Sequence, residues 1–225
     1  MDKEQLAIQK IKEQGILPLF YHDDASICIA VIKTLYEAGI RCIEFTNRGS
    51  SALASFKSMI IERDVSMPEL TLGIGTIRSS DDATAFLDAG ADFLVSPFFD
   101  SGVCDVAYMN KVLWIPGCMT ATEIHTAQNA GCSLMKLFPG NVLGPGFVES
   151  VAPLFNGIDF MVTGGVDSSE ESIREWFNSG VAAVGIGGKL VSKNILQKGD
   201  YQQLKAKTIE VLSIIKKIKS ASQVG

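Results

Sequence analysis

The chain has 225 residues, of which 47% are hydrophobic and 20% charged, a balance that excludes an intrinsically disordered protein. Its formal net charge of −5 gives no reason to expect nucleic acid or an anionic membrane surface as a partner. No run of about 18 apolar residues is present to span a membrane.

The N-terminal stretch MDKEQLAIQKIKEQ is charged and amphipathic and predicts a helix. It lacks the apolar core of a signal peptide. The five cysteines are odd in number, show no CxxC spacing and mostly fall in apolar stretches, so we expect free thiols in a reducing compartment. These features together predict a soluble, cytoplasmic protein.

One pattern recurs four times along the chain. In each copy a helical pattern ends in Ala-Gly or Ser-Gly, and a short apolar run follows after one or two residues. Glycine suits the left-handed residue just past a helix C-terminus. The spacing of the copies fits one strand–helix–strand–helix unit each, and they occupy residues 37–46, 88–97, 129–140 and 178–188.

Four further apolar runs complete a set of eight predicted strands, at residues 16–20, 70–75, 112–116 and 158–163. Capping residues begin several of the helices between them, in the stretches 79–89, 120–130 and 167–179. Most strands are apolar on consecutive residues, as parallel strands buried on both faces should be. Eight strands and eight helices predict a (β/α)₈ TIM barrel with an extra N-terminal helix, formed as one domain by residues 1–225. A doubly wound open sheet is the alternative.

Two of the predicted strands carry a charge among core-type side chains, Glu44 in RCIEFT and Lys136 in SLMKLFPG. Because side chains alternate along a strand, the apolar neighbours can pack on the helices while both charges point into the barrel. The two strands are the second and the sixth of eight, and so lie opposite each other. Both charges stand near the C-terminal ends of their strands, where barrels place active sites. We therefore expect the pair to meet in the barrel mouth.

This pair has a chemical use. A buried lysine with a lowered pKa can attack a carbonyl carbon as a neutral amine and form a Schiff base. Glu44 can then move protons on the adduct as a general base. The alternative is a buried salt bridge without function, which is at best a weak stabiliser after desolvation.

Loops at the ends of other strands supply groups that can bind anions. Arg48, just past Glu44, offers a fork of donors suited to a carboxylate or phosphate, or else is a solvated loop arginine. Thr76 ends the stretch GIGT with a hydroxyl. Paired glycines end the last two strands, in TGG (163–165) and GIGG (185–188), where barrels usually bind phosphate through bare backbone N–H groups.

Other motifs with chemical roles are missing from the sequence. No cluster of His, Asp, Glu or Cys has metal-ligand spacing, so we predict neither a catalytic metal nor another cofactor. No Ser–His–Asp arrangement emerges, and GxGxxG is absent. His22 is expected in a loop ahead of a capped helix, and His125, inside a helix, is expected to be structural or exposed.

The motifs described so far resemble those of a known family. The stretches EFTNR, GIGT, IPGCMTATE, MKLFP, TGG and GIGG are similar to the 2-keto-3-deoxy-6-phosphogluconate (KDPG) / 4-hydroxy-2-oxoglutarate (KHG) aldolase family over nearly the whole chain. The combination of the ExTxR and KxFP strand endings is highly specific. The resemblance implies a metal-free, pyruvate-forming class I aldolase (a lyase) of the Entner–Doudoroff route, built as a (β/α)₈ barrel and usually a homotrimer.

By the same resemblance, Lys136 is the Schiff-base lysine and Glu44 the general acid/base. Arg48 and Thr76 match positions that hold the pyruvate carboxylate. Pro97 and Phe138 match residues that form the pocket walls. The phosphate end is matched by Thr163, Gly164, Gly165, Gly187 and Gly188. The implied substrate is a small 2-keto acid: KDPG or its galactonate epimer, which gives pyruvate and glyceraldehyde 3-phosphate, or KHG, which gives pyruvate and glyoxylate.

One residue departs from the family pattern. Members that prefer the phosphorylated sugar acid often carry Ser after the last Gly-Gly, where this chain has Lys189. A lysine there either binds phosphate as a point charge or points away, so the need for a substrate phosphate stays open. Two other interpretations also stay open: a phosphosugar isomerase or epimerase, and a barrel that binds a metabolite without catalysis.

Overall fold

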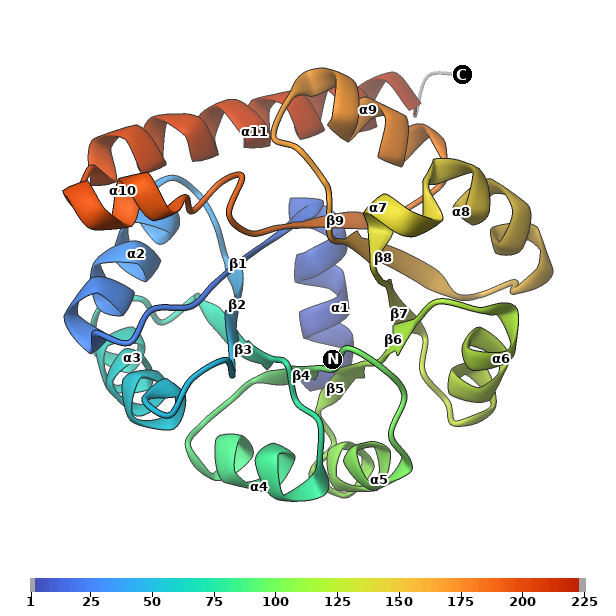
Figure 1. Cartoon of the computed structure of the whole chain (residues 1–225), viewed down its shortest axis with the longest axis horizontal. Helices are drawn as coiled ribbons and strands as arrows, with labels where there is room; N and C mark the ends of the chain where they lie inside the picture. The colour runs from blue at the N-terminus through green and yellow to red at the C-terminus, as the bar shows by residue number, and fades with distance from the viewer. Residues whose placement is uncertain (1–2, 223–225) are drawn as a thin grey trace.

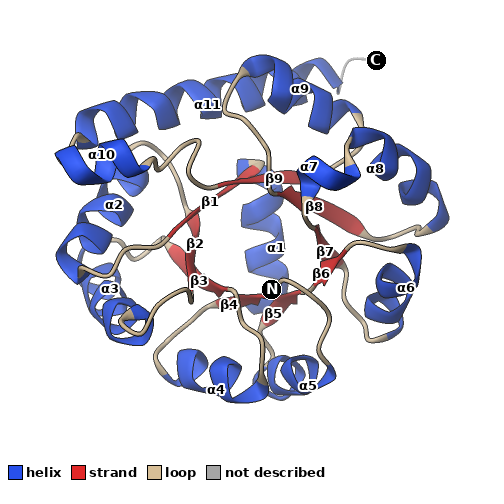
Figure 2. Cartoon of the chain, in the orientation of Figure 1, coloured by secondary structure: helices blue, strands red, loops and turns tan. Residues whose placement is uncertain are grey.

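The computed structural model describes residues 3–222, whose strands form a ring enclosed by helices (Figures 1 and 2). All strand pairs are parallel. The strands are β1 (Ile16–Phe20), β2 (Cys42–Thr46), β3 (Thr71–Gly75), β4 (Phe93–Val95), β5 (Leu113–Ile115), β6 (Gly117–Cys118), β7 (Leu134–Leu137), β8 (Asp159–Thr163) and β9 (Ala183–Ile186). Their order around the sheet is β5-β4-β3-β2-β1-β9-β8-β7-β6.

The ring closes through one short segment of chain. β5 pairs with β4, and β6, only two residues further along, pairs with β7. Pro116 lies between β5 and β6 and has no N–H group to continue the strand ladder, but its carbonyl accepts a hydrogen bond from the N–H of Lys136 at 2.9 Å. The fifth strand, predicted at 112–116, therefore continues past Pro116 as the separate short strand β6. The barrel prediction is confirmed, and the open sheet is excluded.

Helices follow the strands around the outside, with two consecutive helices after β7 and after β9 (Figure 2). They are α1 (Lys3–Gln14), α2 (Ala25–Glu37), α3 (Ala52–Ser66), α4 (Ser80–Asp88), α5 (Ser101–Asn110), α6 (Ala121–Asn129), α7 (Gly140–Leu143), α8 (Pro145–Val151), α9 (Glu170–Asn178), α10 (Lys193–Lys198) and α11 (Tyr201–Ser222), with a 3₁₀ turn at Ala152–Leu154. Among the helices of residues 3–222, none combines the length and apolar character that crossing a bilayer requires.

The predicted helix ends are confirmed. Ser79, Thr120 and Ser169 cap α4, α6 and α9, each accepting a hydrogen bond from a backbone N–H of the first turn. The four repeated glycines all have positive φ, which glycine adopts without the steric cost of a Cβ, and they are Gly39, Gly90, Gly131 and Gly180.

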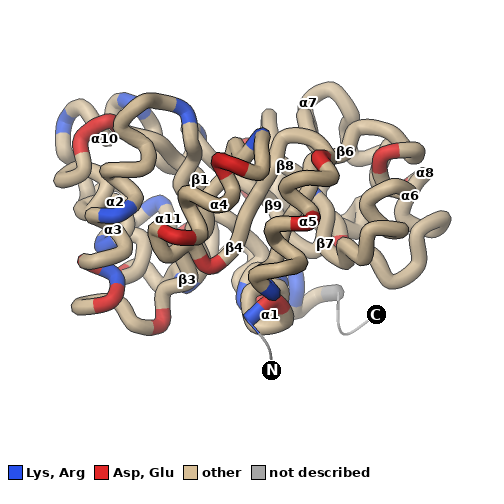
Figure 3. Tube along the Cα trace, turned by 90° about the horizontal axis from the view of Figure 1, so that it is seen from below, with Lys and Arg blue, Asp and Glu red and all other residues tan. Residues whose placement is uncertain are grey.

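The extra N-terminal helix α1 covers one end of the barrel. Ala7 and Ile11 are buried in a cluster with interior side chains from the strands, such as Leu17 and Cys42. Figure 3 shows α1 at one end of the molecule and α7 at the other. Since α7 follows the C-terminal end of β7, the barrel mouth lies at the end opposite α1.

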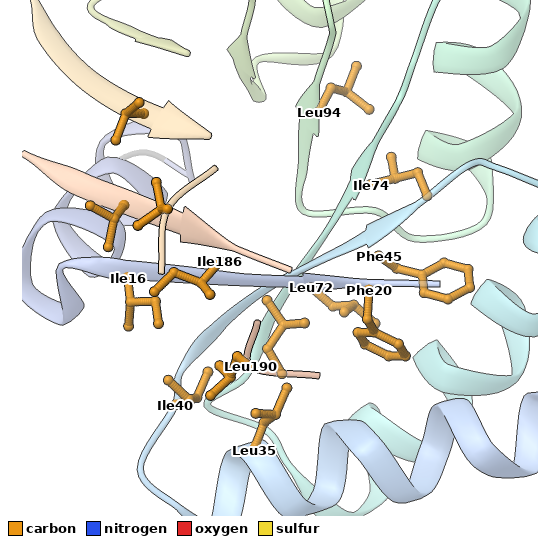
Figure 4. Packing of buried hydrophobic residues seen from close by; sticks show 14 of the residues in the cluster. Ile16, Phe20, Leu35, Ile40, Phe45, Leu72, Ile74, Leu94, Ile186 and Leu190 are labelled. Carbon is orange, nitrogen blue, oxygen red and sulfur yellow. The ribbon is translucent and has the colours of Figure 1, made fainter. Parts of the chain in front are cut away.

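The strand faces divide as the period of two predicts. The outward side chains form the large core between the strands and the helices, in which Ile43 and Phe45 of β2 are fully buried. Phe45 packs against the rings of Phe20 and Phe56, with centroid distances of 5.4 and 6.3 Å. Figure 4 shows Phe20 and Phe45 side by side. This outer core holds the backbone of β2 and so sets the direction in which its inward residues point.

Candidate active site

Glu44 points from β2 into the barrel interior and towards the mouth. Its side chain is 1% exposed. In the strand pairing Glu44 lies opposite Gly73, but its carboxylate lies over Gly75, two residues nearer the C-terminal end of β3. A Cβ at Gly75 would be only 1.8 Å from Oε1 of Glu44. Oε2 of Glu44 is buried and has no hydrogen-bond partner among the described residues.

Lys136 occupies the corresponding place on β7. It is 6% exposed, and its strand partners are Gly117 on β6 and Met161 on β8. Its Nζ lies 4.9 Å from the ring centroid of Phe138, which follows at the C-terminal end of the same strand. The amine therefore also points towards the mouth, with an aromatic ring as its near neighbour.

Burial shifts the pKa values of the two groups in opposite directions. It raises the pKa of Glu44 above its ordinary value, against the pull of Lys136 and Arg48. It lowers the pKa of Lys136, which Glu44 opposes and Arg48 reinforces. The amine and the carboxylate influence each other without forming a direct ion pair. The result is an amine that loses its proton more easily and a carboxyl that keeps one more easily.

Thr163 is a second buried polar group without a partner. It ends β8 with 5% of its surface exposed, and its Oγ1 has no hydrogen-bond partner among the described residues. A Cβ at Gly185, its strand partner on β9, would lie 2.4 Å from that oxygen. Buried polar atoms nearly always have partners, so the free oxygens of Glu44 and Thr163 mark a place where polar groups of a bound molecule would complete the site.

Glycines leave room for these side chains. Gly75 and Gly185 make space for Glu44 and Thr163, and a side chain at Gly117, opposite Lys136, would collide with the carbonyl of Pro97 at 2.2 Å. Pro97 itself is half-buried just past β4. The predicted wall residues Pro97 and Phe138 therefore both lie beside the strands around Lys136.

Replacement of Gly75 by Ala should displace the Glu44 carboxylate. The added methyl group would overlap Oε1, and the flexible carboxylate moves more easily than the backbone. A displacement of about 1 Å can cost about 10²-fold in rate, so we expect kcat of the reaction in which Glu44 takes part to fall by that order. Gly146→Ala is the matched control, because a Cβ there meets no atom within 4 Å. Wild-type kcat in Gly75→Ala would show that the position of the carboxylate is unimportant.

Arg48 and Thr76 are brought together at the ends of β2 and β3. They line a cavity of 490 Å³ with Asn47, Gly49 and Arg78. The N–H of Asn47 donates to the carbonyl of Gly75 at 2.8 Å, which fixes the loop after β2 to the end of β3. Thr76 has φ +63°, an unusual left-handed conformation for a β-branched residue and one that tends to occur at functional sites.

The two glycine pairs end the neighbouring strands β8 and β9. Gly164 and Gly165 have φ of +94° and +79°, and a side chain at Gly165 would collide with Asn141 of α7. Gly188 is exposed, and a Cβ there would meet no atom within 4 Å. The loop after β8 thus packs closely on α7, while the loop after β9 offers bare backbone at the mouth.

Lys189 is tied to the neighbouring loop. Its Nζ lies 3.0 Å from Oδ2 of Asp167, and the two side chains are 65% and 43% exposed. The ammonium therefore stays at the edge of the two glycine loops. The helices that follow, α9 and α10, are capped by Ser169 and Ser192, whose side chains take up one first-turn N–H group each.

The two histidines have the local roles expected of them. Nδ1 of His22 accepts a hydrogen bond from the N–H of Asp24 at 3.0 Å, and His125 is exposed on α6 beside Asn129. Within residues 3–222 no group of three or more His, Cys, Asp or Glu side chains is placed to hold a metal ion.

Sequence reasoning singled out Arg48 and Thr76 of this cavity but missed Arg78, the second arginine that lines it. It stands two residues past Thr76 in GIGTIRSS, in a stretch that predicts only a loop before a capped helix. Its position in the sequence could have identified it, because residues just past the C-terminal end of a barrel strand lie at the mouth.

A closed parallel barrel with a buried amine and a buried carboxyl at its C-terminal end has the construction of an enzyme that acts covalently on carbonyl compounds. The family model described as KDPG and KHG aldolase matches residues 7–207. This protein belongs to that family.

Individual relatives agree with the family match. The chain is 29% identical over 211 residues to a 2-dehydro-3-deoxy-phosphogluconate aldolase of Treponema pallidum, covering 93% of this chain and 96% of the relative. It is also 29% identical to a solved 4-hydroxy-2-oxoglutarate/2-dehydro-3-deoxyphosphogluconate aldolase, with a TM-score of 0.79 and coverage of 93% and 98%. A KDPG aldolase from Legionella pneumophila, solved with pyruvate as a covalent carbinolamine, shares the fold at 21% identity, with a TM-score of 0.81 and coverage of 88% and 93%.

Proposed function

We propose that this protein is a class I aldolase that cleaves 2-keto-3-deoxy-6-phospho-sugar acids of the KDPG type to pyruvate and glyceraldehyde 3-phosphate, and KHG to pyruvate and glyoxylate. The observation that carries the proposal is the buried pair of Lys136 and Glu44, with pKa values shifted in opposite directions, in a member of the KDPG and KHG aldolase family.

The reaction begins at Lys136. Burial lowers its pKa, which favours the neutral amine, and Nζ of that amine attacks C2 of the 2-keto acid. The carbinolamine loses water and becomes an iminium. Its positive nitrogen withdraws electrons from C3, so the lysine supplies the electron sink and the proposed reaction needs no metal.

Glu44 carries out the proton transfers. Its carboxylate, directly or through a water molecule, takes the proton of the C4 hydroxyl, and the C3–C4 bond breaks. The bonding electrons form an enamine on the pyruvate half, and the aldehyde leaves. Glu44 returns the proton to C3, which becomes the methyl group of pyruvate, and hydrolysis of the iminium frees pyruvate and Lys136. The raised pKa suits a group that must both take and give a proton.

The remaining site residues hold the two ends of the substrate. We assign the carboxylate to Arg48 and Thr76, which share one cavity, and the hydrophobic walls to Pro97 and Phe138. The distal end lies against Thr163 and the glycine loops, whose members are Gly164, Gly165, Gly187 and Gly188. Lys189, held by Asp167 at the edge of these loops, adds a positive charge there.

An isomerase or epimerase, and a barrel that only binds a metabolite, explain fewer of the observations. Either could use the glycine loops for a phosphate. Neither has a use for a buried amine opposite a buried carboxyl, which are costly to hold unless chemistry needs them.

The direct test is release of pyruvate, measured by coupling to a pyruvate-consuming dehydrogenase. We expect turnover of KDPG, of its galactonate epimer, or of KHG, with kcat/KM ranking the three substrates. A substrate panel that yields no pyruvate, while an isomerase assay on phosphosugars is positive, would overturn the proposal.

The proposal also covers the setting of the enzyme. We place it in the cytoplasm, as a single-domain chain, from its cysteines, its N-terminal stretch and its strand pattern. The Entner–Doudoroff type of route and the homotrimer come from the family resemblance. Light scattering on the purified protein tests the trimer, since a monomer mass at micromolar concentration would contradict it.

A further inference from the structure

Two arginines share the cavity at the ends of β2 and β3. Arg48 comes from the loop after β2 and Arg78 from the loop after β3, and these paired strands are neighbours in the ring (Figure 1). Both side chains are exposed at the mouth. Neither guanidinium forms an ion pair or hydrogen bond with another residue of the described range 3–222. Two unpaired positive charges that line one cavity repel each other unless an anion lies between them.

The backbone at Arg78 is held on both sides. Ile77 is fully buried, and its N–H donates to the carbonyl of Val95 at 3.2 Å. Ser79 caps α4, with its Oγ accepting from the N–H of Asp82 at 3.1 Å. The Arg78 side chain therefore projects from a fixed point, which reduces the entropy lost when it holds a ligand.

The neighbouring carboxylate is already engaged. Oδ1 of Asp82 accepts a hydrogen bond from Nδ2 of Asn47 at 3.3 Å. This contact joins the two loops of the cavity. Asp82 forms no ion pair with Arg78, which lines the cavity together with Arg48.

We propose that Arg78 is a second cation of the carboxylate subsite, so that the carboxylate of the 2-keto acid is held between the guanidiniums of Arg48 and Arg78. This inference rests on the proposed function. The Glu44 carboxylate lies over Gly75, and the next residue, Thr76, lines the cavity, so the cavity lies beside the reacting groups. The substrate carboxylate is bonded directly to the carbon that Lys136 attacks, so it is the anionic group that must lie nearest to them.

This assignment predicts how substrates respond to Arg78. The carboxylate is common to KDPG, its epimer, KHG and pyruvate, whereas the phosphate is present only in the first two. Loss of Arg78 should therefore weaken binding of all four by a similar factor. A residue that served the phosphate would affect only the phosphorylated compounds.

The test uses pyruvate alone. Borohydride reduces the iminium to a stable secondary amine, and the mass of the intact protein reports the trapped fraction at each pyruvate concentration. For Arg78→Gln we expect the half-saturating concentration to rise about tenfold, the scale of one charge-assisted contact, with complete trapping at high pyruvate. Arg78→Lys, which keeps the charge but loses the fork, should lie in between. Arg174→Gln, which removes an exposed arginine on α9 from its pair with Glu170, is the matched control.

Each outcome separates this inference from the proposed function. An equal half-saturating pyruvate concentration in Arg78→Gln and wild type overturns the role of Arg78. A rise of KM that is confined to the phosphorylated substrates overturns it too. If wild type itself fails to trap pyruvate, the aldolase proposal fails and the role of Arg78 fails with it.

Discussion

Replacement of Lys136 by Met should abolish aldol cleavage while leaving the barrel folded. Without the amine no iminium forms, and the C3–C4 bond has no electron sink. We expect kcat to fall by at least about 10⁴-fold, because removing the group that forms the covalent intermediate leaves only substrate binding and general effects of the site. The measurement is pyruvate release at saturating substrate.

The same variant should not lose stability. Met fills a similar volume, removes the desolvation cost of an ammonium, and leaves Glu44 free to bind a proton. We expect a free energy of unfolding at neutral pH equal to or above that of wild type. Lys57→Met, on the exposed face of α3, is the control and should keep full activity. Cleavage at more than a hundredth of the wild-type rate in Lys136→Met would exclude this lysine as the nucleophile.

Replacement of Glu44 by Gln should slow cleavage by about 10²–10⁴-fold, the range for losing a general acid–base. The amide keeps the shape of the side chain but cannot take the proton from the C4 hydroxyl. Because the base must be deprotonated to act, the wild-type rate should fall on the acid side as Glu44 is protonated. Glu44→Gln should lose that acid limb, and the kcat–pH profile measures this directly. Retention of the limb would assign it to another group.

The raised pKa of Glu44 also predicts a pH-dependent difference in stability. In the unfolded chain the carboxyl titrates near its ordinary value of 4.5, and burial raises the pKa in the folded protein. As pH rises from 4.5 through the folded pKa, the folded state holds more protons and wild type loses stability relative to Glu44→Gln. Below pH 4.5 the carboxyl is protonated in both states, so its titration no longer changes the difference in stability between the two proteins. Urea unfolding of both proteins across this pH range measures the effect. A difference in free energy of unfolding that does not change with pH would contradict the raised pKa of Glu44.

The alternation of side chains made much of this structure predictable. In β2 it separates Phe45, which packs on the helices, from Glu44, which points inward, and in β7 it does the same for Lys136. The repeated glycine after the helices located the N-terminal ends of four strands. Each of these glycines adopts the left-handed conformation that ends a helix, which other residues rarely adopt. Local rules of this kind fix the faces of strands and the ends of helices.

Other features depend on contacts between segments far apart in the chain. The division of the fifth strand at Pro116 follows from hydrogen bonds to two different neighbours, β4 and β7. The pairing of Lys189 with Asp167 and the shared cavity of Arg48 and Arg78 follow from the positions of adjacent loops. No periodicity encodes such contacts, and so the sequence left them open.

The most direct measurement is to locate the covalent adduct. The protein is incubated with pyruvate and borohydride, digested, and its peptides are sequenced by mass spectrometry. The account predicts that wild type gains the mass of one reduced pyruvate unit on Lys136 and that Lys136→Met gains none. An adduct on a different lysine, or equal labelling of the two proteins, would contradict it.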